Sequence, residues 1–377
     1  RTWTHAAPIF RLVSGQPAAT VWVSRFHRGC RQPPMRKIRI ILGFLISAVF
    51  LYFALRGQDF DAVREAFRQV DLWYLIPAIL LYFAGLCVRA FRWRLLLMPI
   101  ADVPVKTLLS TNAVGLMANN VLPLRTGEVV RAYALSKRTS VTKSAALATI
   151  AVERIFDGMT MLLFISLSMI FVSLTSELRH VAVLAAIVFS IALLLIIMLA
   201  HGGDLRDRFL RIALGYLPSP AQERASRMAG SFIAGLGVFS NWRSLLLVGG
   251  TSILAWTFEA SVYWVTARAF GGQIADAMSI APTFLTTGIA NLATLVPSSP
   301  GYVGPFEAAV ILVLNGALDL SRAMALSYAI LVHALLYFPV TLWGAIEWSR
   351  LHLSLRQIDD LSGEGADQAA SPVGARQ

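Results

Sequence analysis

Two stretches of the sequence place helix-breaking residues beside side chains that bind charged groups. Each follows an apolar run, reads aliphatic-Pro-x-x-x-Gly, and then resumes as an apolar segment with a glutamate. The first stretch contains Asn120, Pro123, Arg125, Gly127, Glu128 and Arg131, and the second contains Pro297, Gly301, Gly304 and Glu307. Proline lacks an amide hydrogen and glycine tolerates positive φ, so this spacing ends one helix and reverses the chain. Both stretches are therefore predicted to be broken membrane helices.

The arginines of the first stretch could bind an anion. A guanidinium offers forked donors, and a restarting helix exposes free backbone amides, a combination that suits a phosphate group. We therefore favour a binding role for Arg125 and Arg131. The alternative is that they set the topology, which is the better explanation for Lys137, Arg138 and Lys143.

Two glutamates and a histidine could exchange protons. Glu128 and Glu307 follow the two breaks, where they could hold a proton or a cationic headgroup. The alternative is helix capping, because carboxylates in a first turn favour the positive end of the helix dipole. Histidine titrates near neutral pH, which suits proton coupling, but a histidine inside an apolar run, as His333 is, is more often a packed, hydrogen-bonded group.

Three further charges lie inside one long apolar run. Glu153, Arg154 and Asp157 are spaced so that Arg154 lies near Asp157 on a helix, with Glu153 on the same side. Each charge inside a bilayer costs roughly 2.5 to 3.5 kcal/mol on insertion scales, so these groups should face the bundle and one another. A structural ion pair and a part in a transport path fit this pattern equally well.

The composition is that of a polytopic membrane protein. Of 377 residues, 56% are hydrophobic and 14% are charged, and the mean hydropathy is +0.65. The net charge of +12 comes from Lys and Arg in short loops, which indicates topology and contact with anionic lipid rather than nucleic acid. Cys30 and Cys87 are too few for a disulfide framework or a cysteine metal site. The sequence has no motif for ATP binding, zinc hydrolysis or serine hydrolysis, and we expect no cofactor and no metal.

The elements that position these residues are helices. Apolar runs long enough to span a bilayer occupy residues 38–55, 72–88, 145–174, 181–200, 245–266 and 324–346. We expect an all-α polytopic membrane protein with about 6–8 transmembrane helices. A basic cluster, Arg36, Lys37 and Arg39, precedes the first run and places the amino terminus in the cytoplasm. The carboxyl terminus is expected on the same side of the inner (plasma) membrane.

Charge also predicts that the two broken segments are re-entrant hairpins of opposite orientation. The apolar run 105–122 follows Arg89, Arg92 and Arg94, which we interpret as the cytoplasmic end of the preceding span, and more basic residues come after it. Both ends therefore favour the cytoplasm. Residues 278–318 carry almost no charge, which suits a hairpin that enters from the outer side. Two full spans over the same residues would leave the carboxyl terminus on the same side of the membrane. The expected result is an inverted repeat.

The domain organisation follows from these runs. Met35 directly precedes the first basic cluster, and residues 1–34 are predicted to be a non-native or disordered leader. The remaining predicted parts are a membrane domain over 35–350 with halves 72–200 and 245–347, an amphipathic connector over 204–240 at the inner surface, and a disordered cytoplasmic tail over 351–377.

The sequence between Asn119 and Leu135, the pair Glu153-Arg154 and the sequence from Val296 to Glu307 resemble the lysylphosphatidylglycerol synthase transmembrane region family, over roughly residues 36–350. The resemblance implies a flippase-like domain that moves or handles a phospholipid, glycolipid, hopanoid or polyprenyl lipid. The positions that match the family are Asn120, Pro123, Gly127, Glu128, Arg131, Glu153, Arg154, Pro297, Gly301, Gly304 and Glu307. Synthases of this family carry a large soluble catalytic domain after this region. Only a short polar tail follows here, so we expect no aminoacyl transfer.

We expect the chain to translocate a lipid with an anionic headgroup through a polar groove between the two hairpins. Arg125 or Arg131 would hold the phosphate, and Glu153, Asp157 or Glu307 would relay charge. This interpretation makes membrane lipids the partners, with lipid-synthesis enzymes as possible further partners, and does not make the protein an enzyme.

Two other functions fit the sequence. One is an intramembrane lipid-modifying transferase that uses a polyprenyl or glycolipid donor, with Glu128 or Glu153 as the base. The other is a non-catalytic assembly factor for a lipid or envelope pathway.

Overall fold

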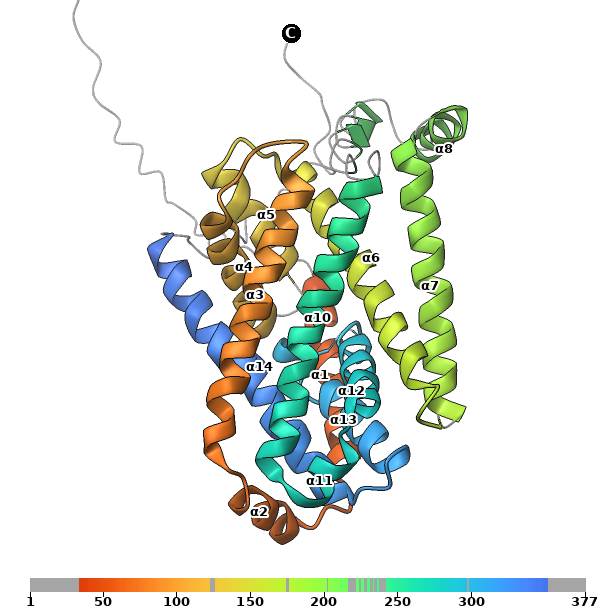
Figure 1. The fold of residues 1–377 in the computed structure, drawn as a ribbon. Helices are drawn as coiled ribbons and strands as arrows, with labels where there is room; N and C mark the ends of the chain where they lie inside the picture. Colours follow the sequence, from red (N-terminus) through yellow and green to blue (C-terminus); the bar gives the residue numbers. More distant parts are fainter. Residues whose placement is uncertain are drawn as a thin grey trace, which may run out of the picture.

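The structure is a computed structural model that describes residues 34–122, 126–173, 176–201, 203–215, 242–296 and 298–351, with a few residues between 222 and 236. Three predicted site residues, Pro123, Arg125 and Pro297, lie outside the described residues. Almost all of the predicted leader and tail, and most of the predicted connector, also lie outside them. All regular secondary structure within the described ranges is helical (Figure 1).

The first half of the chain forms helices that match the predicted runs. Its elements are α1 (Pro34–Leu55), α2 (Phe60–Arg68), the short 3-10 helix η1 (Leu72–Tyr74), α3 (Leu75–Leu97), α4 (Val105–Val121), α5 (Gly127–Arg138), α6 (Lys143–Ser168), α7 (Ser176–His201) and α8 (Asp204–Gly215). The later elements are α10 (Trp242–Phe270), α11 (Gly272–Ala277), α12 (Ile280–Ala293), the 3-10 turn η4 (Pro300–Tyr302), α13 (Pro305–Gly316) and α14 (Arg322–Arg350).

Several of these helices are long and apolar enough to cross a membrane. By length and composition, the candidates among the described residues are Leu72–Leu97, Trp242–Phe270 and Arg322–Arg350, with a fourth if Ile41–Leu55 and Phe60–Arg68, bent by 82°, form one span. The helix α6 has 26 residues, but its central part contains Glu153, Arg154 and Asp157. Large apolar side chains are exposed along α1, α7 and α14, as expected for contact with lipid. The predicted class, an all-α polytopic membrane protein, is confirmed.

The two broken segments form hairpins at opposite ends of the bundle. In Figure 1, α4 and α5 occupy the upper half, where α3 ends and α6 begins, and α12 and α13 occupy the lower half. The series α3, hairpin, α6 is thus repeated upside down as α10, hairpin, α14. The two tips meet in the middle of the bundle, where Gly301 of the second tip packs beside the Asn120 backbone carbonyl of the first. The Tyr337 hydroxyl of α14 donates to the same carbonyl at 3.3 Å. This is the predicted inverted arrangement.

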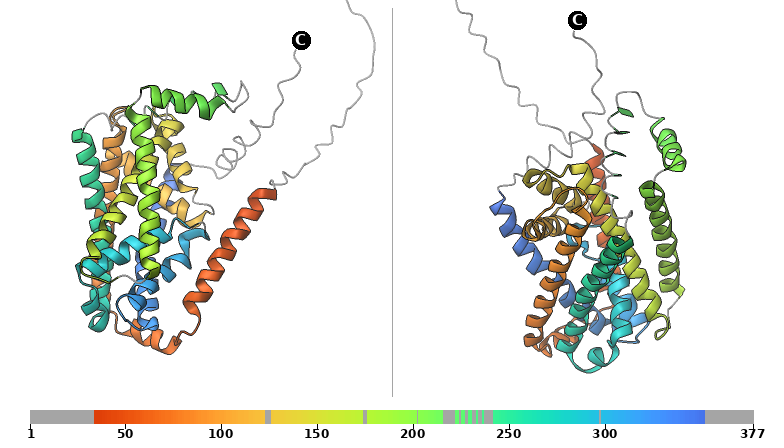
Figure 2. Two further views of the ribbon diagram at one scale, coloured as in Figure 1. Left: turned by 90° about the vertical axis from the view of Figure 1, so that its right-hand side faces the viewer. Right: turned by 45° about the horizontal axis from the view of Figure 1, so that its top comes forward.

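Two apolar clusters of buried side chains make up most of the core, and both draw on helices from the two halves. One cluster of buried side chains joins α10, α12, α13 and α14, and a second joins α3, α5 and α6. The helices α6 and α12 link the halves, because the rings of Phe164 and Phe284 stack at 4.2 Å. Figure 2 shows α1 leaning away from the bundle at its upper end, while lower down Ser47 accepts a hydrogen bond from the Ser299 amide at 2.8 Å.

The short helix α8 lies across the upper end of α7 (Figure 2). Leu205, Phe209 and Ile212 are exposed and follow helical spacing, so they form one apolar stripe. The helix α8 is therefore amphipathic. The connector over 204–240 and its position at the inner surface of the membrane stay predictions.

One boundary predicted from charge is wrong. The span that starts near residue 72 does not end before Arg89, because α3 continues to Leu97 with Arg89 and Arg92 facing the interior. The side chain of Arg92 is 1% exposed and that of Arg89 is 14% exposed. Carboxylates on α6 and α10 compensate both charges, which removes the penalty that would otherwise drive an arginine to the surface. Only Arg94 of this group lies outside, where it contacts Asp102.

Candidate functional site

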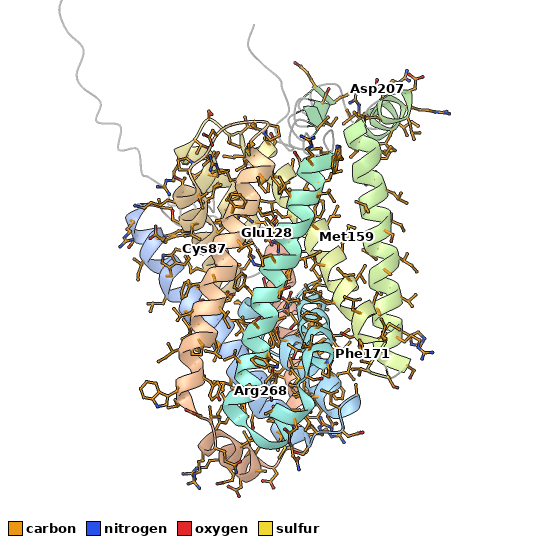
Figure 3. The ribbon with its side chains drawn as sticks, viewed as in Figure 1. Cys87, Glu128, Met159, Phe171, Asp207 and Arg268 are labelled. Carbon is orange, nitrogen blue, oxygen red and sulfur yellow. The ribbon has the colours of Figure 1, made fainter. Side chains whose placement is uncertain are left out.

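A cavity of about 160 Å³ lies in the middle of the bundle, between the tips of the two hairpins. Helices from both halves contribute to its wall, and Glu128, labelled in Figure 3, lies beside it at the centre of the fold. Its polar lining includes Arg89, Arg92, Asn112, Asn119, Asn120, Glu128, Arg131, Glu153, Arg154, Glu259, Asn291, Tyr302, His333 and Tyr337. An interior space of this polarity in a membrane protein marks a candidate binding site.

Four arginines and three carboxylates beside this cavity form an ionic cluster, made of Arg89, Arg92, Arg131, Arg154, Glu153, Asp157 and Glu259. At its centre, Arg92 contacts Asp157 at 2.6 Å and Glu153 at 3.6 Å. The other oxygen of Glu153 contacts Arg131 at 2.6 Å. The cluster thereby ties α3 and α5 to α6.

The ionic cluster extends to α10 through aromatic contacts. Arg89 contacts Glu259 at 2.6 Å and lies 4.1 Å from the centre of the Trp256 ring. The Trp256 indole donates a hydrogen bond to Asp157 at 2.7 Å. Buried charges are stable only when each has close partners, and these contacts supply them from four helices.

The spacing argument for α6 is correct. Arg154 contacts Asp157 at 3.0 Å, and Glu153 lies in the same cluster. Glu153 is almost fully buried, whereas 39% of the Arg154 side chain is exposed. The cluster therefore reaches from the buried interior to an accessible edge of the cavity.

Arg131 has donors that no described residue uses. Its Nη1 contacts Glu153, and its guanidinium lies 3.6 Å from the centre of the Trp93 ring. Its Nε and Nη2 are buried and have no hydrogen-bond partner among the described residues. A buried guanidinium normally uses its donors, because an unmade hydrogen bond costs free energy. These two donors could hold an anionic group in the cavity.

The first hairpin is closed by a side chain and a close backbone approach. The Asn119 carbonyl oxygen accepts a hydrogen bond from the Gly127 amide at 2.7 Å, and the Asn119 amide donates to Glu128 at 3.4 Å. A Cβ on Gly127 would collide with the Gly115 carbonyl and with the Asn119 amide. Glycine at 127 therefore allows α5 to restart directly against α4.

The second hairpin turns through an unusual backbone. Gly301, Tyr302 and Gly304 have φ values of 74°, 61° and 101°, a region that L-residues with a side chain rarely adopt. The Gly304 amide donates to Glu307 at 2.7 Å, which is the capping role considered for this glutamate. The second oxygen of Glu307 contacts Nδ1 of His333, so both residues are hydrogen-bonded.

The structure brings most of the predicted residues to one place. Asn120, Gly127, Glu128, Arg131, Glu153 and Arg154 line the cavity. Asp157 lies in the ionic cluster, Gly301 and Gly304 form the second break, and Glu307 adjoins the lining residue His333. Pro123, Arg125 and Pro297 lie outside the described residues.

Sequence reasoning missed the partners on α3, α10 and α12. Arg89 and Arg92 were assigned to topology, and Glu259 and Asn291 were given no role, yet all four line the cavity. A signal was present, because Arg89 and Arg92 are three positions apart and share a helix face, and Glu259 lies alone in an apolar run.

The fold and the site define a multi-pass membrane protein with a charged interior site between two broken helices. The chain belongs to the family described as the lysylphosphatidylglycerol synthase TM region, which matches residues 40–344. The family expected from the sequence motifs is therefore confirmed.

Relatives of this chain include proteins from archaea. It is similar to Glycosyltransferase AglD of Haloferax volcanii, with 24% identity over 360 residues, covering 88% of this chain and 58% of that protein. It is also similar to a UPF0104 membrane protein of Methanothermobacter thermautotrophicus, with 27% identity over 290 residues, 73% of this chain and 83% of the relative. A UPF0104 membrane protein of Methanocaldococcus jannaschii is 22% identical over 341 residues, 87% of this chain and 97% of the relative. The chain thus spans less than two thirds of the Haloferax protein.

Proposed function

We propose that this protein translocates a membrane lipid whose anionic headgroup enters the central cavity while its acyl chains stay in the bilayer. The observation that carries the proposal is Arg131, whose buried Nε and Nη2 have no hydrogen-bond partner among the described residues. A phosphate oxygen would satisfy both donors in the forked geometry that guanidinium groups favour.

The surroundings of Arg131 support an anionic headgroup over a free polar solute. The cavity lies between hairpins that approach from opposite ends of the bundle, which is the architecture of alternating access. The outer faces of α1, α7 and α14 are apolar and exposed, so a lipid tail has favourable surroundings while its headgroup is inside. We place the protein in the inner (plasma) membrane, with the open end of the first hairpin and both termini on the cytoplasmic side.

A second candidate function is a transferase that modifies a lipid within the membrane. The printed name of the Haloferax relative favours it, since that protein is called a glycosyltransferase. Glu128 and Glu153 line the cavity and are the candidate bases.

Transport of labelled lipids into vesicles that contain the purified protein tests the proposal. We expect protein-dependent movement of an anionic lipid across the bilayer, and a loss of about tenfold or more in Arg131→Gln, since a hydrogen-bonded charge contact contributes roughly 1.5 to 3 kcal/mol. Arg131→Lys keeps the charge beside Glu153 but loses the fork, so it should also be slow. Arg94→Gln is the matched control, because among the described residues the ion-pair partner of Arg94 is the exposed Asp102.

Two results would redirect the interpretation. Absence of protein-dependent movement for every anionic phospholipid, glycolipid and polyprenyl lipid tried would contradict the translocase. A deletion strain that lacks one lipid species altogether, instead of accumulating it in the wrong leaflet, would favour the transferase.

A further inference from the structure

The second hairpin contains a buried contact between a carboxylate and an imidazole. Glu307 Oε1 on α13 lies 2.5 Å from Nδ1 of His333 on α14, and the side chains are 7% and 12% exposed. The other imidazole nitrogen, Nε2, lies 2.8 Å from the Gly301 carbonyl oxygen. The other carboxylate oxygen accepts the Gly304 amide at 2.7 Å. These three contacts connect α14 to both glycines of the break.

Counting donors and acceptors fixes the number of protons in this pair. A carbonyl oxygen only accepts, so Nε2 of His333 must carry a hydrogen toward Gly301. The contact between Nδ1 and Oε1 then needs one further proton, which resides either on the imidazole or on the carboxyl group. Without it, an imidazole lone pair would face a carboxylate oxygen at hydrogen-bonding distance, which is repulsive. The observed geometry therefore requires that Glu307 and His333 share one proton.

We propose that Glu307 and His333 form a proton-binding site, and that its proton holds the second hairpin against α14 and the first hairpin. The inference goes beyond the proposed function, because it concerns what joins the hairpins and does not depend on which molecule enters the cavity. The ligand of the site is a proton, and no other reactant is needed.

The proton site reaches the first hairpin through one face of α14. His333, Tyr337 and Thr341 are four residues apart, so they lie in a row along the helix. His333 contacts the second hairpin, whereas Tyr337 donates to the Asn120 carbonyl and Thr341 accepts the Asn120 amide at 2.8 Å. Pro339 lies between Tyr337 and Thr341 in the chain and removes one internal helix hydrogen bond, which makes a bend of α14 easier at this point.

The tip of the second hairpin has an unusual backbone conformation and is hydrogen-bonded to α1. Tyr302 and Gly304 have positive φ values, and the Ser299 amide bonds to Ser47 of α1. A backbone in such a conformation persists only where its surroundings hold it. Loss of the shared proton would leave one facing pair of acceptors, either Nδ1 with Oε1 or, in the other tautomer, Nε2 with the Gly301 carbonyl oxygen, and this repulsion would separate the tip from α14.

Other titratable and charged side chains also line this cavity. In the first half these are Tyr82, Arg89 and Arg92 on α3, Glu128 and Arg131 on α5, and Glu153 and Arg154 on α6; in the second half they are Glu259 on α10, Tyr302 on η4 and Tyr337 on α14. Arg131, Arg154 and Glu259 have ion-pair partners in the ionic cluster. Among the described residues, His333 is the titratable side chain that Glu307 contacts directly.

The reactivity of a cysteine at the tip tests the proposal without any transport measurement. Ser299→Cys is introduced into a chain in which Cys30 and Cys87 are serine, and its reaction with a thiosulfonate reagent is measured in nanodiscs from about pH 5 to about pH 9. Reaction of a free small thiol with the same reagent over the same pH range corrects for ionisation of the thiol itself. The same cysteine is also introduced into Glu307→Gln. Glutamine offers an oxygen to Gly304 and an N–H to Nδ1, so it imitates the protonated pair at every pH.

We expect the corrected reactivity of the native pair to rise about tenfold with pH, the effect of losing one strong hydrogen bond, and Glu307→Gln to show no such rise. His333→Gln also removes the shared proton site and should abolish the transition. His180→Gln, at an exposed histidine at the start of α7, is the matched control and should retain it. Circular dichroism and gel filtration check that each variant is folded.

Two outcomes would overturn the proposal. One is a transition of the native size in folded Glu307→Gln or His333→Gln, since another group would then be titrating. The other is a flat profile in the native pair, since the proton would then not control the tip. Failure of lipid transport would contradict the proposed function and leave this result unchanged.

Discussion

Replacement of Asp157 by asparagine removes the most connected charge of the ionic cluster with almost no change in shape. Asp157 contacts Arg92 at 2.6 Å, Arg154 at 3.0 Å and Arg89 at 4.0 Å, and accepts a hydrogen bond from Trp256. An asparagine oxygen still accepts the indole hydrogen. What is lost is the negative charge that compensates Arg92.

The expected cost follows from the burial of each partner. Breaking a buried ion pair by removing one charge costs about 3 to 5 kcal/mol, because the other charge stays uncompensated. Arg92 is 1% exposed and falls in this category, because among the described residues its remaining carboxylate partner is Glu153 at 3.6 Å. The Arg154 side chain is 39% exposed, so its contact adds less than about 1 kcal/mol. We therefore expect Asp157→Asn to lower the free energy of unfolding by about 3 to 5 kcal/mol.

The measurement is equilibrium unfolding of the purified protein in mixed micelles by increasing dodecyl sulfate, followed by circular dichroism. Asp102→Asn is the matched control, because Asp102 makes an ion pair of similar length with Arg94 but its side chain is 80% exposed. This control should lose less than about 1 kcal/mol. The double variant Arg92→Gln with Asp157→Asn should lose less than the sum of the two single variants.

Equal losses in Asp157→Asn and Asp102→Asn would refute this reasoning. That result would mean that water or lipid headgroups reach Asp157 and screen it as they screen a surface carboxylate. Strict additivity in the double variant would lead to the same conclusion, because it would show no coupling between Arg92 and Asp157.

Two further predictions concern the hairpins. Gly127→Ala should destabilise the protein by about 1 to 3 kcal/mol in the same unfolding measurement, because its Cβ would overlap the Gly115 carbonyl and the Asn119 amide; Gly250→Ala, where a Cβ meets nothing within 4 Å, should be neutral or slightly stabilising. Single cysteines at Ser140, after α5, and at Asp319, after α13, should be labelled by a membrane-impermeant reagent from opposite sides of the membrane; labelling of both from one side would show that the hairpins are not inverted.

The sequence alone determined where the helices and their interruptions lie. Apolar runs and Pro-Gly breaks are local signals, because backbone hydrogen bonding in a bilayer must be satisfied within each helix. For this reason the predicted run 105–122 corresponds to α4 (Val105–Val121), and the family was evident from the motifs around the two breaks. The pairing of Arg154 with Asp157 was also predictable, since it depends only on helical periodicity.

Tertiary structure decided which charges belong to the site. Arg89 contacts Glu259, which is 170 residues away in the sequence, and Arg92 contacts Asp157, which is 65 residues away. The sequence around such an arginine does not distinguish it from an arginine that marks the end of a membrane span. The contact of Glu307 with His333 likewise depends on two helices meeting. Whether a charge can lie inside a membrane protein is determined by the partners that surround it, and those partners are known only once the helices are packed.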